Sequence, residues 1–292
     1  MARTLLSAYV ELTKPRILTM VLVTTCLGFT LGGGLQPYGL FFWTMLGTGC
    51  ASGGAGALNH YLEREVDAKM ARTQGRPLPS GQISPAYALL LGILLSAAGS
   101  GLLWYFANGL AAALALATVL LYACIYTPVK RVSWWNTPIG AIPGAIPPMI
   151  GWAAAKGELN IGAWVLFFIL FLWQHPHFYA IAWMFREDYA RGGFKMLPVV
   201  QPDGKNTFRQ SLAAAIILIP VSLWPTFVQM SGWLYFTGAL LCGFWFLSAC
   251  VRWRLSGTTE DARKVLRVSV FYLPCILLLI LVDHFFERVF LS

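Results

Sequence analysis

Residues 59–67 read Asn-His-Tyr-Leu-Glu-Arg-Glu-Val-Asp and directly follow an apolar run that is rich in Gly and Ala. In a helix, Asn59, Glu63 and Asp67 occupy positions i, i+4 and i+8, so their side chains share one face. Oxygen ligands of this kind suit Mg²⁺, which binds proteins through one or two carboxylates together with waters and substrate phosphates. The stretch therefore predicts a magnesium site at the end of an apolar helix.

A basic loop is expected after this helix. Gly75, Pro77 and Gly81 predict the end of the helix. Arg72 and Arg76 are therefore expected in a loop close to the C-terminal end of this helix. Guanidinium groups bind phosphate oxygens in a bidentate geometry. We interpret the whole stretch as a site for magnesium diphosphate. The alternative is a solvated helix end, where each pair of opposite charges contributes only about 0.2–0.5 kcal/mol.

The composition indicates the class of protein. Of the 292 residues, 58% are hydrophobic and 11% are charged, and the mean hydropathy is +0.65, whereas soluble domains carry about 25% charged residues. This composition is typical of an integral membrane protein. Nine apolar runs approach the roughly 20 residues that cross a bilayer, and they cover approximately 17–35, 38–58, 83–105, 109–127, 137–155, 160–182, 211–229, 233–251 and 268–286.

The basic residues indicate an orientation in the membrane. A net charge of +9 would fit a nucleic-acid partner if the basic residues were gathered in one domain, but they lie between the spans. Nine crossings put 19 of the 21 Lys and Arg residues on one side, Arg3 among them, and only Lys156 and Arg288 on the other. The positive-inside rule then predicts a cytoplasmic N-terminus and a C-terminus on the outer side. No nucleic-acid partner is expected.

Two other features have simple interpretations. The strongly basic stretch 252–267 is expected to be a solvated cytoplasmic loop that faces anionic lipid. All six Cys residues fall inside apolar runs and show no C-x-x-C spacing, so we expect small core residues and neither disulfides nor zinc ligands.

A second polar cluster is expected at the end of the sixth run. His177 and Asp188 are eleven residues apart, which is about 1,100° of helix, so both would share a face with His177 deeper in the membrane. Polar side chains within spans are costly and usually functional. The alternative for His177 is a hydrogen-bonded core histidine, and the spacing leaves both interpretations open.

The fifth run contains too many prolines for a regular helix. Four of them fall within residues 138–148. Irregular backbone at membrane depth is tolerated only where protein or a polar cavity satisfies the freed backbone groups. We therefore expect this span to line a cavity.

The two acidic clusters and the surrounding cations suit a polyanion carried by a metal. An allylic diphosphate fits, because metal and cations neutralise the departing pyrophosphate. The carbocation left behind needs a dry aromatic cavity, and 14% of the residues are aromatic. The cations concerned are Arg72, Arg76, Lys130, Arg131, Arg186, Arg191 and Lys195.

At these residues the sequence resembles the UbiA superfamily of membrane prenyltransferases, and within it the branch whose acceptor is heme b. Long strings carry the resemblance: T-K-P-R at 13–16, N-H-Y-L-E-R-E-V-D-A-K-M-A-R-T-Q-G-R-P-L-P at 59–79, Y-T-P-V-K-R at 126–131, N-T-P-I-G-A-I-P-G-A-I-P-P at 136–148, and H-P-H-F-Y-A-I-A-W-M-F-R-E-D-Y-A-R-G-G-F-K-M-L-P at 175–198.

The resemblance implies an all-α integral membrane protein, a single domain over residues 1–292, with nine transmembrane helices bundled around a central cavity. It implies transfer of the farnesyl group of farnesyl diphosphate to a vinyl group of heme b, with addition of water, giving heme O and diphosphate. The implied cofactor is Mg²⁺. The implied location is the cytoplasmic membrane of a bacterium, which the chain crosses several times.

The resemblance also implies roles for individual residues. Asn59, Glu63 and Asp67 would hold Mg²⁺, and Glu187 and Asp188 would form the second metal-binding cluster, with Asn59, Glu63, Asp67 and Asp188 as the catalytic set. The diphosphate would bind to Arg72, Arg76, Lys130, Arg131, Arg186, Arg191 and Lys195. The heme would contact His175 and His177, with His177 as a candidate axial ligand to the iron.

The sequence departs from the superfamily pattern at two positions, which leaves the number of metal ions open. The middle acidic position is Glu63, and the residue four before Asp188 is Met184. A quinone precursor or a chlorophyll-type ring is an alternative acceptor, although the His-Pro-His string favours heme. A transporter is disfavoured because the ionisable residues gather at one membrane face instead of the midplane. Candidate partners beyond the substrates and the lipid bilayer are the next heme-modifying enzyme and a terminal oxidase.

Overall fold

The structure is a computed structural model that describes residues 4–33 and 36–290, and all secondary structure in these two ranges is helical. Arg3, one of the predicted cytoplasmic basic residues, lies outside them. The chain divides into two compact units, which we describe separately. Unit 1 comprises residues 1–158 and 187–195, and unit 2 comprises residues 159–186 and 196–292. The prediction of a single domain stays a prediction.

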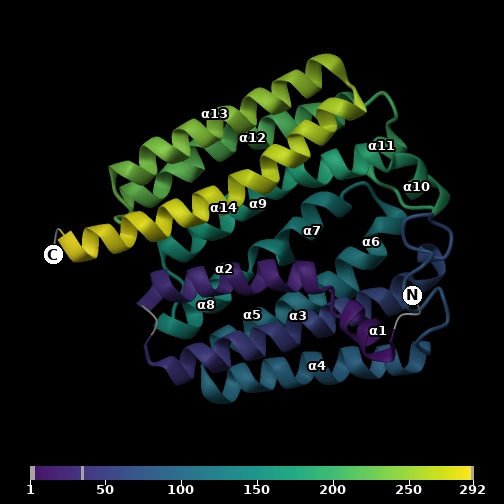
Figure 1. The fold of residues 1–292 in the computed structure, drawn as a ribbon, viewed down its shortest axis with the longest axis horizontal. Helices are drawn as coiled ribbons and strands as arrows, with labels where there is room; N and C mark the ends of the chain where they lie inside the picture. The colour runs from purple at the N-terminus through teal and green to yellow at the C-terminus, as the bar shows by residue number, and fades with distance from the viewer. Residues whose placement is uncertain (1–3, 34–35, 291–292) are drawn as a thin grey trace. The chain divides into compact units, whose positions relative to one another are not determined.

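Unit 1 is built on two pairs of closely packed helices (Figure 1), in which α3 packs against α4 and α2 packs against α8. Ser84 caps the first turn of α4, and Asn108 caps that of α5. The helices of the first 158 residues are α1 (Leu5–Leu12), α2 (Pro15–Gly33), α3 (Tyr38–Asp67), α4 (Pro85–Phe106), α5 (Gly109–Leu120), a π-helix (Leu121–Tyr126), α6 (Thr127–Val132), α7 (Asn136–Ala145) and α8 (Pro147–Lys156). The short α10 (Arg186–Arg191) begins at the boundary of the two units.

Glycines set the distance between α2 and α8. A Cβ atom on Gly28 would meet the carbonyl oxygen of Pro148, and one on Gly151 would meet the carbonyl oxygen of Thr25. Both obstacles are backbone atoms, which cannot rotate out of the way. Small residues let membrane helices approach closely and gain dispersion contacts, so these two glycines fix the packing of α2 on α8.

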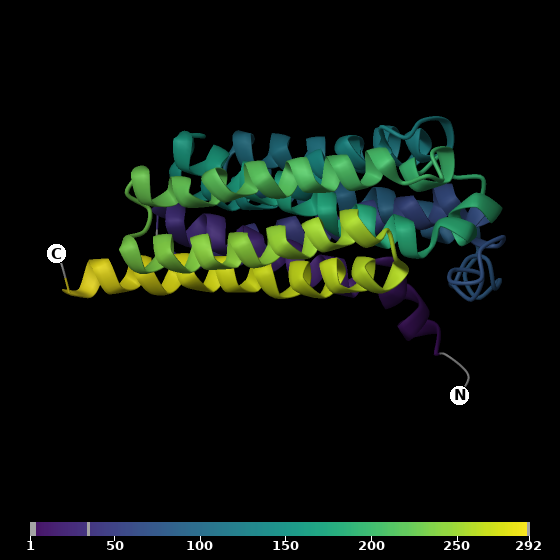
Figure 2. The same cartoon turned by 90° about the horizontal axis from the view of Figure 1, so that it is seen from above.

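Unit 2 is a ring of four long helices (Figures 1 and 2), in which α9 and α13 each pack against both α12 and α14. Aromatic side chains fill it: Tyr235, Phe246, Trp253 and Tyr272 are at most 1% exposed. The helices are α9 (Ile161–Met184), α11 (Leu197–Val200), α12 (Lys205–Phe227), α13 (Trp233–Ser256) and α14 (Thr259–Phe290).

Seven helical segments in the described residues are long and apolar enough to span a membrane, so the chain is a membrane protein. Two of the nine predicted spans are not among them. One lies in α3, whose many glycines and small polar residues lower its mean hydropathy, and the other is divided at Ile146 into α7 and α8, of ten residues each. The proline-rich span is therefore broken, as predicted, whereas a count of nine is not established.

The structure corrects two sequence-based expectations. The stretch 252–267 is not a loop, because α13 continues to Ser256 and α14 begins at Thr259. The proposed shared face of His177 and Asp188 is also wrong, because α9 ends at Met184 and the backbone leaves helical geometry at Phe185. The first expectation was wrong because hydropathy assigns charged residues at a helix end to a loop. The second was wrong because a one-residue interruption between two helices has no strong signal in the sequence.

Replacing Gly151 by Ala is expected to destabilise the protein, because the new Cβ atom would push α8 away from the backbone of Thr25. Overpacking of this kind costs about 1–3 kcal/mol. The matched control is Gly101→Ala in α4, where no atom lies within 4 Å of the added carbon. Thermal denaturation in detergent, followed by size-exclusion chromatography, should give a lower midpoint for Gly151→Ala alone. Equal midpoints for both variants would contradict this account of the α2–α8 contact.

Candidate active site

The predicted acidic face of α3 is present and buried. Asn59, Glu63 and Asp67 lie at the C-terminal end of α3, and their exposed fractions are 0%, 4% and 0%. The 30-residue helix extends without interruption through the charged stretch, so the i, i+4, i+8 spacing does place the three side chains on one face. A solvated helix end is excluded by this burial.

Each of the two carboxylates is paired with a cation from a different segment. The Nζ atom of Lys130, in α6, lies 2.5 Å from Oε1 of Glu63. The guanidinium of Arg76, in the loop after α3, donates to Oδ2 of Asp67 at 2.6 Å. Lys130 also lies 4.4 Å from the ring centre of Tyr126. Buried charges are tolerated when they are paired and hydrogen-bonded, and both pairs meet this condition.

Asn59 is fixed by the π-helix that precedes α6. Its Nδ2 donates to Oγ1 of Thr127 at 2.8 Å, and that hydroxyl donates to the carbonyl of Tyr122 at 2.8 Å. The same carbonyl also accepts the backbone N–H of Thr127, five residues on, because residues 121–126 are wound as a π-helix instead of an α-helix. Single π-turns of this kind often occur at functional sites.

Lys14 belongs to this cluster and was not predicted. Its ammonium group donates to Oδ1 of Asn59 and to the hydroxyl of Tyr122, the latter at 3.3 Å. Burial of the ammonium group lowers the pKa of Lys14 to about 7. Lys14 has a φ of 53°, in the left-handed region that non-glycine residues rarely adopt. The string T-K-P-R at 13–16 contains this residue, but a basic residue before a span by itself indicates only the orientation of the chain.

Asp188 anchors the basic loop that follows α3. Its carboxylate accepts the backbone N–H groups of Ala71 at 3.0 Å and Arg72 at 3.2 Å, and Arg191 lies 2.5 Å from it. The hydrogen bond from Arg191 and then those from the two backbone groups lower the pKa of Asp188. Asp67 holds the same loop through Arg76, so the two acidic clusters meet on one segment.

The other predicted phosphate ligands of unit 1 make different contacts. Arg72 lies beside Tyr189, and their side chains are hydrogen-bonded at 3.3 Å. Arg131 donates to the carbonyl of Leu62 at 2.9 Å. Lys195 is joined to Lys130 through the backbone, at 2.7 Å, and its side chain is exposed.

Two predicted site residues differ from this group. Arg186 belongs to unit 2, where its guanidinium donates to the carbonyl of Trp183 and lies 4.7 Å from the centre of that ring. Glu187 is exposed. Unit 1 contains the remaining predicted metal and phosphate ligands together with Lys14, and they are Asn59, Glu63, Asp67, Arg72, Arg76, Lys130, Arg131, Glu187, Asp188, Arg191 and Lys195.

One atom of the cluster is suited to a metal ion. The described residues contain no group of three His, Cys, Asp or Glu side chains that could hold a metal. However, Oδ1 of Asp67 is buried and has no hydrogen-bond partner, and an orphaned buried carboxylate oxygen is costly. A Mg²⁺ ion bound by one or two carboxylates and substrate phosphates fits this donor set.

His175 and His177 lie on opposite sides of α9, because two residues correspond to about 200° of rotation. Nδ1 of His177 lies 2.8 Å from the Ser269 hydroxyl of α14. Trp173 stacks on His177 and donates its indole N–H to the carbonyl of Ser269 at 2.8 Å. Nδ1 of His175 lies 2.7 Å from the carbonyl of Phe171 in its own helix.

The hydrogen bonds assign the tautomer of both rings. Ser269 has a single hydroxyl proton, which it donates to the carbonyl of Leu266 at 2.7 Å, so the hydroxyl must accept from Nδ1–H of His177. The carbonyl of Phe171 can only accept, which places the proton of neutral His175 on Nδ1 as well. In both residues Nε2 is left unprotonated, as in a histidine that binds a metal.

The sequence comparisons show the family. The model of the UbiA prenyltransferase family matches residues 21–273. A protoheme IX farnesyltransferase of Solibacter usitatus is 51% identical over 286 residues, covering 94% of this chain and 98% of the relative. One of Salinibacter ruber is 46% identical, covering 95% and 98%. The chain belongs to the UbiA prenyltransferase family.

Solved structures share the fold at low identity. A structure described as a digeranylgeranylglyceryl phosphate synthase has a TM-score of 0.82 at 18% identity, covering 96% of this chain and 98% of its own. A UbiA homologue from Archaeoglobus fulgidus, bound to DMAPP and Mg²⁺, has a TM-score of 0.66 at 15% identity, covering 94% and 99%. These likenesses establish the fold.

Replacing Asp188 by Asn is expected to weaken substrate binding by loosening the loop of Arg72 and Arg76, because Asn cannot pair with Arg191 or accept both backbone N–H groups through two equivalent oxygens. Hydrogen exchange at residues 70–76 should rise at least tenfold, since one charged hydrogen bond contributes about 1.5–3 kcal/mol. The matched control is Glu187→Gln, the exposed neighbour. Unchanged exchange in Asp188→Asn would show that Asp188 does not hold the loop.

Proposed function

We propose that this protein transfers the farnesyl group of farnesyl diphosphate to a vinyl group of heme b, with addition of water, giving heme O and diphosphate. Membership of the UbiA prenyltransferase family supports prenyl transfer. The curated relatives with up to 51% identity over nearly the whole chain are named for the farnesylation of protoheme IX, which supports heme b as the acceptor.

The observation that carries the proposal is the buried cluster at the end of α3, in which Asp67 keeps one oxygen without a partner while cations pair the remaining charges. A diphosphate brings negative charge that Lys14, Arg76 and Lys130 could bind. These cations are already inside the protein, so substrate binding requires no new burial of positive charge. The desolvation of the cluster is part of folding.

Substrate binding then exchanges partners within the cluster. In the absence of substrate, Lys130 balances Glu63 and Arg76 balances Asp67. With the diphosphate present, the two cations would turn to phosphate oxygens and the two carboxylates would hold Mg²⁺ together with Asn59. A bound Mg²⁺ would neutralise the pyrophosphate as it leaves. The protein contributes fixed positive groups aimed at the developing negative charge.

The second metal-binding cluster of Glu187 and Asp188 stays a prediction. The carboxylate of Asp188 already accepts hydrogen bonds at both oxygens. Its proposed contribution is to hold the loop of Arg72 and Arg76 beside Asp67, which is compatible with either one or two metal ions.

On the heme side we assign His177 as the candidate axial ligand. The hydrogen bond to Ser269 leaves Nε2 of His177 unprotonated, and the indole of Trp173 fixes the plane of the ring. A histidine that binds a metal typically donates its other ring N–H to an acceptor. His175 has the same tautomer, but its ring N–H donates to a carbonyl of its own helix. A substitution at His175 therefore serves as the control for one at His177.

The proposed topology is nine crossings, with α3 and the broken pair α7 and α8 as the two additional spans. The predicted cytoplasmic N-terminus and outer C-terminus rest on the distribution of basic residues. The bacterial relatives support a location in the cell membrane. A partner oxidase or a second heme-modifying enzyme stays a prediction.

Replacing Asp67 by Asn is expected to lower magnesium-dependent farnesyl transfer to heme b at least a hundredfold, since it removes a carboxylate that would hold the metal. The assay measures heme O by chromatography and mass spectrometry after incubation with farnesyl diphosphate in detergent. Gly101→Ala, whose added carbon meets no atom within 4 Å, controls for loss of activity during purification in detergent. A quinone precursor that is farnesylated in place of heme b would overturn the proposed acceptor.

Replacing His177 by Ala is expected to shift the Soret band of bound heme b and to weaken its binding at least tenfold, because an axial ligand is lost. The comparison is His175→Ala, which leaves the Trp173–His177–Ser269 contacts in place. Absorption spectra during heme titration measure both quantities. If the two variants give the same spectrum as the wild type, His177 is not a ligand to the iron.

A further inference from the structure

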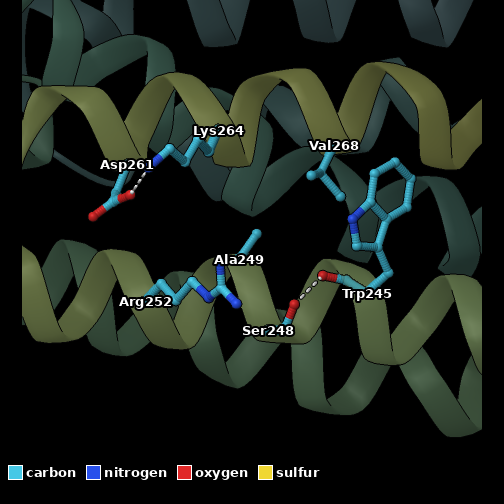
Figure 3. A pocket seen from close by; sticks show the side chains of 7 residues that line it. All are labelled: Trp245, Ser248, Ala249, Arg252, Asp261, Lys264 and Val268. Atoms are coloured by element: carbon cyan, nitrogen blue, oxygen red, sulfur yellow. Dashed lines mark hydrogen bonds and ion pairs between the residues drawn. The ribbon is translucent and has the colours of Figure 1, made fainter.

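A pocket of about 280 Å³ lies between α13 and α14 of unit 2, outside the proposed active site (Figure 3). The proposed reaction assigns it no role. Its volume is slightly below the range of about 300–1,000 Å³ that is typical of ligand pockets, which suits a headgroup-sized fragment. The helices are joined by a short connection at Gly257 and Thr258, so the pocket lies in the groove of a helical hairpin.

One end of the pocket is charged. Arg252 of α13 lies opposite Asp261 and Lys264 of α14 (Figure 3). Lys264 lies 3.0 Å from Asp261 and 3.2 Å from Glu260, so its single ammonium group is already paired with two carboxylates of α14. Arg252 has no hydrogen-bond or ion-pair partner among the residues that the structure describes. The pocket therefore offers a free guanidinium to an anion.

The other end of the pocket is apolar. Trp245, Ala249 and Val268 line it (Figure 3). Trp245 precedes Arg252 by seven residues, and Val268 follows Asp261 by seven, which in both helices is about 10 Å along the axis. The apolar end is therefore nearer the middle of both spanning helices, and the charged end is nearer their termini.

The surroundings favour a lipid. The segment 252–267 carries five basic and two acidic residues, and the positive-inside rule predicts that this end faces the cytoplasm. Leu241, Phe244, Leu255 and Phe271 on the same two helices are 55–82% exposed, as expected for side chains that face acyl chains. The cytoplasmic leaflet is rich in anionic lipids, which attract basic groups near its surface.

We propose that the groove between α13 and α14 binds one anionic phospholipid, with its phosphate at Arg252 and an acyl chain along Trp245 and Val268. The guanidinium supplies paired donors for phosphate oxygens. Arg252 is the phosphate-binding group of the pocket, because the ammonium group of Lys264 is already paired with Asp261 and Glu260. The indole of Trp245, near the middle of α13, offers an apolar surface to the acyl chain. The site is independent of farnesyl transfer, because none of its residues belongs to the proposed reaction.

The test is native mass spectrometry of the full chain in neutral detergent, with phosphatidylglycerol or phosphatidylethanolamine added. The wild type should retain one phosphatidylglycerol molecule in preference to phosphatidylethanolamine. Arg252→Gln should lower this retention about fivefold, since one basic residue near an anionic surface contributes that factor. Arg254→Gln, which removes an exposed charge outside the pocket, should leave retention unchanged.

A second variant keeps both basic groups and fills the apolar end. Ser248→Trp should also reduce retention of phosphatidylglycerol, because the new ring would occupy the groove. The proposal is overturned if Arg252→Gln and Arg254→Gln lower retention equally, or if phosphatidylethanolamine is retained as well as phosphatidylglycerol. Displacement of the lipid by millimolar inorganic phosphate would indicate a small-anion site instead. A dimer that dissociates in Arg252→Gln would indicate a protein partner.

Discussion

The pairing of buried charges at the end of α3 is the interaction on which the site depends. Glu63 and Asp67 are held inside a membrane protein, where an unpaired carboxylate would cost several kcal/mol. Their partners come from two other parts of unit 1: Lys130 follows the π-helix, and Arg76 lies in the loop after α3. The ion pairs therefore fix the relative positions of three segments as well as neutralising charge. Breaking such a pair by removing one partner typically costs about 3–5 kcal/mol.

The scaffold of unit 1 supports this cluster in specific ways. The carbonyl of Tyr122, in the π-helix, accepts the backbone N–H and the hydroxyl of Thr127, and this hydroxyl in turn accepts from Asn59. Asp188 fixes the backbone of the loop that carries Arg72 and Arg76. Close packing through Gly28 and Gly151 joins α2 to α8, and Lys14 enters the cluster from immediately before α2. The proposed exchange of ion-pair partners needs this rigidity, because only the side chains should have to move.

Much of the fold and the site could be predicted from the sequence. Hydropathy located the long helices because a bilayer requires about 20 apolar residues per span, and helical spacing placed Asn59, Glu63 and Asp67 on one buried face. What could not be predicted depends on tertiary contacts. The positive φ of Lys14 and the π-helix at 121–126 have no simple pattern in the sequence, and neither does the break at Phe185 that separates His177 from Asp188. The hydrogen bonds from the loop backbone to Asp188 also have no pattern in the sequence, and the metal-binding role of Glu187 and Asp188 stays a prediction. The packing of Arg186 on Trp183 could not be predicted either, and its role as a phosphate ligand stays a prediction.

We propose that Asp67 and Glu63 bind a metal ion only when a diphosphate replaces them as the ion-pair partner of Arg76 and Lys130. Electron paramagnetic resonance of Mn²⁺, used in place of Mg²⁺, tests it directly by measuring free Mn²⁺ during titration of the purified protein with a non-hydrolysable farnesyl diphosphate analogue. Protein and analogue together should bind Mn²⁺ at least tenfold more tightly than either alone, and Asp67→Asn should abolish the gain. Equally tight binding of Mn²⁺ without the analogue, or an undiminished gain in Asp67→Asn, would contradict the account.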